Sequence, residues 1–166
     1  DTDQTYCGFA ALIGPTNAGK STLVNALVGQ KVAITSRKVQ TTRNRLRGIC
    51  HDGSAQIVLV DTPGIFRPGK RRLERAMVDA AWQGAGVADA VALIVDAART
   101  PDAPENKDLI DTLARHLDPA VPCVLVLNKI DKIKRAELLQ RVEAYNDLYN
   151  FTDVFLISAL KDDGVD

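Results

Sequence analysis

The stretch that decides the fold is Gly14-Pro15-Thr16-Asn17-Ala18-Gly19-Lys20-Ser21, which reads G-x-x-x-x-G-K-S. It follows the apolar run CGFAALI at residues 7–13, which has the length of a strand, and it leads into KSTLVNALV at residues 20–28, which has the spacing of a helix. A glycine-rich turn between a strand and a helix is the context of a phosphate-binding loop. The pattern therefore predicts that Lys20 contacts the terminal phosphates of a nucleotide and that Ser21 offers its hydroxyl to Mg²⁺.

The residues of this loop support the same interpretation. Gly14 and Gly19 have no side chain, so the backbone can approach a phosphate group closely. The alternative is a turn that only caps a helix, and the flanking strand and helix make it the weaker one. The predicted phosphate-binding residues are Gly14, Pro15, Thr16, Asn17, Ala18, Gly19, Lys20, Ser21 and Thr22.

The composition fits one globular domain over residues 1–166. Hydrophobic residues make up 46% of the chain, and 21 Lys and Arg balance 21 Asp and Glu, so the net charge gives no argument for nucleic-acid binding by this segment. The sequence has neither an apolar run of membrane-spanning length nor a signal-peptide pattern. Cys7, Cys50 and Cys123 lie in apolar stretches without metal-ligand spacing, and we expect three buried, reduced thiols in a cytosolic protein.

Apolar runs of strand length alternate with helical patterns along the chain, which predicts an α/β fold. Asp52-Gly53 separates two strand-like runs and favours an antiparallel hairpin. We expect the three-layer P-loop NTPase fold, with a six-stranded, mostly parallel sheet, one antiparallel edge strand and helices on both faces. The predicted strands cover residues 7–13, 46–51, 54–60, 90–95, 121–127 and 154–157, and the predicted helices cover 20–28, 73–83, 105–117 and 135–149.

The first polar motif at a strand end is Asp61-Thr62-Pro63-Gly64, which follows the run at 54–60. In doubly wound sheets, ligands bind beyond the carboxyl ends of the strands. A carboxylate at Asp61 can hold Mg²⁺ there, and the N–H of Gly64 can contact a γ-phosphate. The motif alone indicates only a turn, and the interpretation as a Mg²⁺ and phosphate site rests on its position at the end of an apolar strand.

The second such motif, Asn128-Lys129-Ile130-Asp131, follows the run at 121–127. A carboxylate at Asp131 can accept hydrogen bonds from the N1–H and the exocyclic amine of guanine, a pair of donors that adenine lacks. The stem of Lys129 can lie over the base, and Asn128 can join this loop to the phosphate loop. The pattern favours GTP over ATP, and the alternative is a polar loop before a helix.

The last strand is followed by Ser158-Ala159-Leu160. A backbone N–H here can bond the O6 atom of guanine, and the equal alternative is that Ser158 caps a helix. Residues 161–166 resemble the start of a helix, so we expect the segment to end near the last helix of its domain.

In this order, the motifs resemble those of the translation-factor-type GTPases. Asn17, Ser36-Arg37-Lys38 and Gln40-Thr41-Thr42-Arg43 narrow the resemblance, over residues 6–165, to the Era family of bacterial ribosome-assembly GTPases. The resemblance implies a switch at 32–45 and a second at 61–72. It implies catalytic roles for Lys20, Thr42 and Gly64, and Mg²⁺ binding by Ser21, Thr42 and Asp61, with Thr41 as the alternative switch threonine.

The same resemblance has implications for the rate of GTP hydrolysis and for the binding of K⁺. Ile65 stands where Ras-type GTPases place a water-orienting glutamine, which implies slow intrinsic hydrolysis of GTP to GDP. In related GTPases an asparagine at the position of Asn17 helps to coordinate K⁺, and the alternative is that Asn17 only supports the turn.

The family further implies partners outside this segment. They are 16S rRNA and the small ribosomal subunit, bound through a C-terminal KH domain that these 166 residues do not include. It also implies a cytoplasmic location, with peripheral association at the inner membrane. We expect the isolated domain to be monomeric. The alternatives are a related GTPase of tRNA modification or large-subunit assembly, a nucleotide-gated binding module with slow hydrolysis, and, more remotely, a small-molecule kinase.

Overall fold

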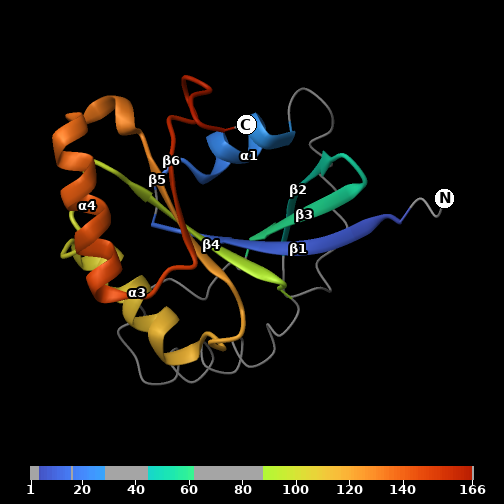
Figure 1. The fold of residues 1–166 in the computed structure, drawn as a ribbon, viewed down its shortest axis with the longest axis horizontal. Helices are drawn as coiled ribbons and strands as arrows, with labels where there is room; N and C mark the ends of the chain where they lie inside the picture. Colours follow the sequence, from blue (N-terminus) through green and yellow to red (C-terminus); the bar gives the residue numbers. More distant parts are fainter. Residues whose placement is uncertain (1–3, 16, 29–44, 62–87, 166) are drawn as a thin grey trace.

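A six-stranded sheet forms the centre of the molecule, with strands in the order β2-β3-β1-β4-β5-β6 (Figure 1). The computed structural model describes residues 4–15, 17–28, 45–61 and 88–165. The strands are β1 (Tyr6–Ile13), β2 (Arg45–Asp52), β3 (Ala55–Asp61), β4 (Ala90–Asp96), β5 (Cys123–Asn128) and β6 (Asp153–Leu156). The α-helices are α1 (Lys20–Val28), α3 (Pro104–His116) and α4 (Arg135–Leu148), and a short 3₁₀-helix, η1, covers Ile130–Lys132.

The sheet is parallel except for its β2–β3 hairpin, which confirms the predicted fold class. β2 pairs antiparallel with β3, and every other neighbouring pair is parallel. The hairpin turns at Gly53, whose φ of 56° explains why the predicted Asp-Gly turn suits this position. The pairing shifts register between Leu46 and Gly48. β2 is therefore the antiparallel edge strand that the sequence predicts.

Two apolar clusters lie on opposite faces of this sheet. Leu93 and Val95 of β4 belong to the cluster that contains the buried residues of α3 and α4, whereas Ile94 between them belongs to the cluster that contains those of α1. This alternation follows from the strand geometry, because successive side chains point to opposite faces. The helices on both faces explain why the central strands are apolar at every position.

The helices begin and end within a residue or two of their predicted bounds. Pro104 starts α3, where its missing N–H costs nothing and its fixed φ suits the first turn. On α4, Leu138 and Tyr145 are buried, as their spacing predicts, and Val142 and Tyr149 pack against the same cluster. The predicted helix at 73–83 lies outside the described residues. None of the described helices is long and apolar enough to cross a membrane.

The prediction of three buried cysteines is confirmed for one of them and wrong for the other two. Cys123 is buried, Cys50 is partly buried, and Cys7 is exposed. β4 pairs with β1 only from Ala10 onward, so the first residues of β1 have β3 as their one partner strand. An apolar run therefore does not guarantee burial near the free end of a strand.

Candidate nucleotide-binding site

The phosphate loop connects β1 to α1, and its two glycines are required by close contacts. A Cβ atom at Gly14 would overlap the carbonyl oxygen of Ile94, and one at Gly19 would overlap the side-chain amide of Asn128. Gly19 also has a φ of 95°, which L side chains rarely adopt. Asn17 is exposed and has a φ of 67°, in the left-handed region. The loop is thus packed against the ends of β4 and β5.

Lys20 is the first residue of α1, and its side chain folds back over the loop. Its Nζ atom donates a hydrogen bond to the carbonyl oxygen of Gly14 at 2.6 Å. The ammonium group is thereby held beside the start of a helix, where the helix dipole also favours anions. Ser21 follows it and is exposed. A hydroxyl at this point is a hard oxygen ligand of the kind that Mg²⁺ prefers, so the described part of the site fits that ion.

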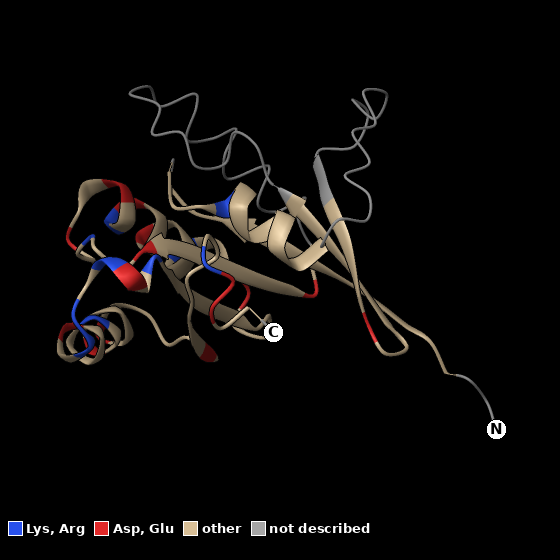
Figure 2. Ribbon diagram, turned by 90° about the horizontal axis from the view of Figure 1, so that it is seen from above, with Lys and Arg blue, Asp and Glu red and all other residues tan. Residues whose placement is uncertain are grey.

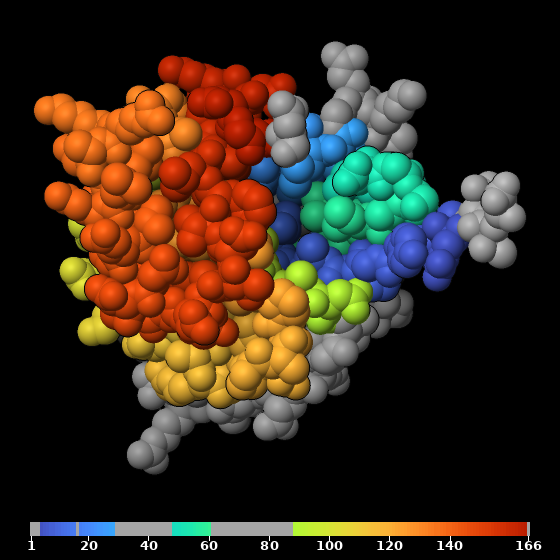
Figure 3. Space-filling model, viewed as in Figure 1, coloured from blue at the N-terminus to red at the C-terminus, as the bar shows by residue number. Residues whose placement is uncertain are grey.

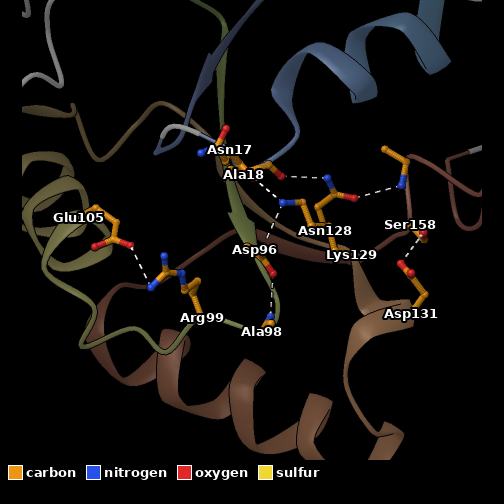
Figure 4. A network of polar contacts seen from close by, with 11 residues as sticks. Asn17, Ala18, Asp96, Ala98, Arg99, Glu105, Asn128, Lys129, Asp131 and Ser158 are labelled. Atoms are coloured by element: carbon orange, nitrogen blue, oxygen red, sulfur yellow. Dashed lines mark hydrogen bonds and ion pairs between the residues drawn. The ribbon is translucent and has the colours of Figure 1, made fainter.

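Asn128, the last residue of β5, joins three segments of the site (Figure 4). Its Nδ2 atom donates to the carbonyl oxygen of Ala18 at 2.9 Å, and its Oδ1 atom accepts from the N–H of Ala159 at 3.0 Å. The side chain is 2% exposed, so both polar atoms of the amide are satisfied inside the protein. This is the predicted connection between the base loop (residues 128–131) and the phosphate loop (residues 14–21).

Lys129 continues the base loop in an unusual backbone conformation. Its φ of 64° is left-handed, and its side chain turns toward the phosphate loop. The Nζ atom donates to the carbonyl oxygen of Asn17 and forms an ion pair with the Oδ2 atom of Asp96 at 3.1 Å. The lysine therefore bridges the phosphate loop and the end of β4.

Asp131 lies in η1 and faces the segment after β6. Its Oδ1 atom accepts a hydrogen bond from the hydroxyl of Ser158 at 2.7 Å, and Nζ of Lys161 lies 3.6 Å from Oδ2. The Ser158 hydrogen bond is the main reason that the pKa of Asp131 lies below its usual value, and Lys161 adds to the effect. The carboxylate is therefore ionised at neutral pH, as an acceptor for guanine must be.

Residues 158–163 form a turn, not the start of a helix. The N–H of Ser158 donates to the carbonyl oxygen of Asp163 at 2.9 Å, and the two residues form an isolated antiparallel bridge. Ser158 consequently does not cap a helix, and the helix expected at 161–166 is wrong for the described residues to 165. The hydroxyl of Ser158 instead supports Asp131, and Leu160 is 81% exposed beside it. The last residues lie against α1 in the space-filling view (Figure 3).

Asp96, which ends β4, is a site residue that the sequence motifs do not include. It pairs in register with Asn128, the residue that ends β5. The signal was present, because Asp96 is a carboxylate at the end of an apolar strand, on the same edge as the two motifs that the analysis selected. It stands in no familiar motif, however, and its contact with Lys129 is visible only in three dimensions.

Several predicted site residues lie wholly or partly outside the described part of the chain. Asp61 ends β3 and its backbone pairs with Leu12, but its side chain is not among the described ones. The other predicted residues outside the described part are Thr16, Thr41, Thr42, Thr62, Pro63 and Gly64. Within the described residues, no group of three or more His, Cys, Asp or Glu side chains could hold a metal ion.

Comparison with known proteins agrees with this geometry. The family model described as 50S ribosome-binding GTPase matches residues 9–129. A protein named GTPase Era from Bradyrhizobium sp. (strain BTAi1) is 55% identical over 163 residues, covering 98% of this chain and 51% of that protein. A crystal structure of Era from Aquifex aeolicus bound to GDP and AlF4⁻ has a TM-score of 0.69 at 36% identity, covering 95% of this chain and 52% of that one. A structure of Era with MgGDPNP and nucleotides 1506–1542 of 16S ribosomal RNA gives the same TM-score and identity. The chain spans about half the length of these relatives.

Proposed function

Because this chain belongs to the family described as 50S ribosome-binding GTPase and is an Era-type GTPase domain within it, we propose that it binds GTP and GDP with Mg²⁺ and acts as a slow molecular switch. The observation that supports this best is the way that Asn128 joins the base loop, the phosphate loop and the segment at Ala159. These contacts support the proposal because they tie the phosphate loop at Ala18 and the segment at Ala159 to Asn128, three residues before the proposed guanine acceptor Asp131. A single nucleotide can then contact both the phosphate loop and Asp131.

The base site favours guanine for a chemical reason. Asp131 is held ionised by Ser158 and Lys161, so it can accept from the two donors on the guanine edge. Adenine offers no such pair, and an unpaired carboxylate at its edge disfavours binding. The aliphatic stem of Lys129 can cover one face of the base.

The phosphate site supplies charge and position for hydrolysis. Lys20 would leave the carbonyl of Gly14 and contact the β- and γ-phosphates, where it would stabilise the negative charge that develops on the leaving β-phosphate oxygen. Ser21, with Thr42 and Asp61, would hold Mg²⁺, and the ion would neutralise phosphate charge when bound. The N–H of Gly64 would contact the γ-phosphate. Ile65 cannot orient the attacking water, so we expect intrinsic hydrolysis on the slow, Ras-type scale.

Nucleotide specificity tests this function directly. In the wild-type protein, GTP should bind and be hydrolysed in the presence of Mg²⁺, whereas ATP should do neither at comparable concentration. Asp131→Asn should weaken GTP binding by roughly 10- to 100-fold, because a charge-assisted pair is lost, and it should improve binding of XTP, whose C2 carbonyl suits an amide. Asp147→Asn, an exposed position on α4, is the matched control. Equal binding of GTP and ATP would instead support the kinase alternative.

The role of the whole protein in ribosome assembly is a separate part of the proposal. It rests on the named relatives, one of which was solved with a 16S rRNA fragment. Blue and red segments alternate along α3, α4 and the connections between them (Figure 2). We assign RNA contact to a C-terminal KH domain, as the resemblance to the Era family implies. We expect a cytoplasmic protein with peripheral inner-membrane association, and a monomeric domain.

Co-sedimentation with small ribosomal subunits tests this assignment. The full-length protein should pellet with the subunits in a nucleotide-dependent way, and the 166-residue segment should not. Pelleting with large subunits or binding to tRNA would favour the related GTPases instead. Partner binding that follows the bound nucleotide but does not require turnover would favour a nucleotide-gated binding module.

We also propose that Asn17 helps to bind K⁺ beside the phosphates. The residue is exposed at the phosphate loop, and its side-chain amide carries an oxygen that can accept a cation. Hydrolysis should then be faster in KCl than in NaCl. Asn17→Gly removes the side chain while tolerating the positive φ, so it should abolish the difference without distorting the loop. A potassium effect that survives in this variant would exclude the role.

A further inference from the structure

The bridge formed by Lys129 depends on a carboxylate that the nucleotide motifs do not include. Asp96 ends β4, and its Oδ2 atom lies 3.1 Å from Nζ of Lys129, with both side chains partly buried at 19% and 25% exposure. The same Nζ atom donates to the carbonyl oxygen of Asn17. One ammonium group therefore has an anionic partner on β4 and a neutral partner on the phosphate loop (Figure 4).

The carboxylate of Asp96 is oriented before it meets the lysine. Its Oδ1 atom accepts from the N–H of Ala98 at 2.9 Å, which leaves Oδ2 facing Lys129. The backbone is fixed as well, because the N–H of Ala97 donates to the carbonyl oxygen of Asn128 at 2.8 Å. An oriented charge loses little entropy when it pairs, so this contact is stronger than a typical surface ion pair.

The two residues that the lysine connects both have left-handed backbones. Lys129 has a φ of 64° and Asn17 a φ of 67°; asparagine adopts this region more readily than other non-glycine residues, whereas for lysine it is uncommon. Such conformations persist where the surroundings hold them. The contacts of the Lys129 ammonium group hold both residues at once, and Asp96 supplies the charge that keeps the ammonium group in place.

We propose that Asp96 is a positioning residue for the guanine nucleotide, which it retains by holding Lys129 against the phosphate loop. The inference rests on the proposed function. Release of a nucleotide requires the base loop and the phosphate loop to separate, and the Asp96–Lys129–Asn17 bridge opposes this separation. Loss of the carboxylate charge therefore accelerates release of GDP and GTP alike, while Asp131 continues to select guanine over adenine.

The experiment measures dissociation of a fluorescent GDP analogue from the full-length protein. Asp96→Asn preserves the shape of the side chain and the acceptor for the N–H of Ala98, but it removes the charge. We expect release to be about five- to tenfold faster, because a partly buried ion pair is intermediate in strength between a surface pair and a fully buried one. The difference from wild type should narrow at high salt. Asp102→Asn is the matched control. Asp102 is exposed on the connection between β4 and α3, so its substitution removes an equal charge and should leave the release rate unchanged.

A double-mutant cycle shows whether Asp96 acts through Lys129. Adding Asp96→Asn to Lys129→Ala should produce little further acceleration if the two residues work as one unit. The preference for GDP over ADP should stay at the wild-type ratio in the Asp96 variant. Release within twofold of wild type, or an effect that adds in full to that of Lys129→Ala, would overturn the inference. Failure of the wild-type protein to bind GDP would instead refute the proposed function.

Discussion

Truncation of Asn128 is the most informative test of how the base loop is held. The side chain is 2% exposed and makes two hydrogen bonds, to the carbonyl of Ala18 and from the N–H of Ala159. Asn128→Ala removes both bonds and leaves two buried backbone groups without partners. Each such loss costs about 1–2 kcal/mol, so we expect the free energy of unfolding to fall by about 2–4 kcal/mol.

Urea unfolding of the 166-residue chain without nucleotide measures this change. The midpoint should fall while the slope stays the same, because the surface exposed on unfolding is unchanged. Asn25→Ala is the matched control, since Asn25 is exposed on α1 and should change stability by less than about 0.5 kcal/mol. If the free energy of unfolding of Asn128→Ala also stays within about 0.5 kcal/mol of wild type, the two hydrogen bonds do not hold the loops together.

Three further outcomes follow from the titratable and buried groups. The pKa of Asp131 is lowered in the folded state, so its contribution to stability is present at neutral pH and is lost as pH falls through that pKa. Ser158→Ala should raise this pKa in a carboxylate NMR titration and should weaken the acid dependence of the free energy of unfolding. Burial raises the pKa of the Cys123 thiol to about 12, so iodoacetamide at pH 8 should modify the exposed Cys7 first and Cys123 only after unfolding. Tyr145→Phe removes a hydroxyl that accepts a buried amide hydrogen bond and should lower the free energy of unfolding by about 1 kcal/mol, measured in urea.

The fold was predictable because periodicity and turn chemistry point to the same answer. Apolar runs bounded by Gly, Pro and polar motifs indicate buried parallel strands, and Asp52-Gly53 indicates the hairpin. Cys7 shows the limit of this reasoning. Its burial depends on how far β4 extends along β1, which is a property of the pairing register and not of the local pattern.

The site was predictable where chemistry is concentrated in short motifs. The phosphate loop and Asn128–Asp131 are contiguous, so residue type and spacing suffice to identify them. Asp96 and the turn at Ser158 were harder, because their roles depend on partners distant in sequence. Asp96 meets Lys129 across neighbouring strands, and the bridge between Ser158 and Asp163 replaces the helix that the local polar pattern suggests.

The central position of β1 has a consequence for synthesis on the ribosome. Tyr6 pairs with Ala55 and Ala10 pairs with Ala90, so the strand that carries the phosphate loop obtains its two neighbours 49 and 80 positions later. At about 5–20 residues per second, it waits roughly 4–16 s before the second neighbour has been translated. Among the described strand pairs that precede β4, the β2–β3 hairpin joins strands that are neighbours in the sequence, so it can form in the meantime. The nascent chain thus exposes an unpaired apolar edge throughout this interval, and this is the period in which it most needs a chaperone.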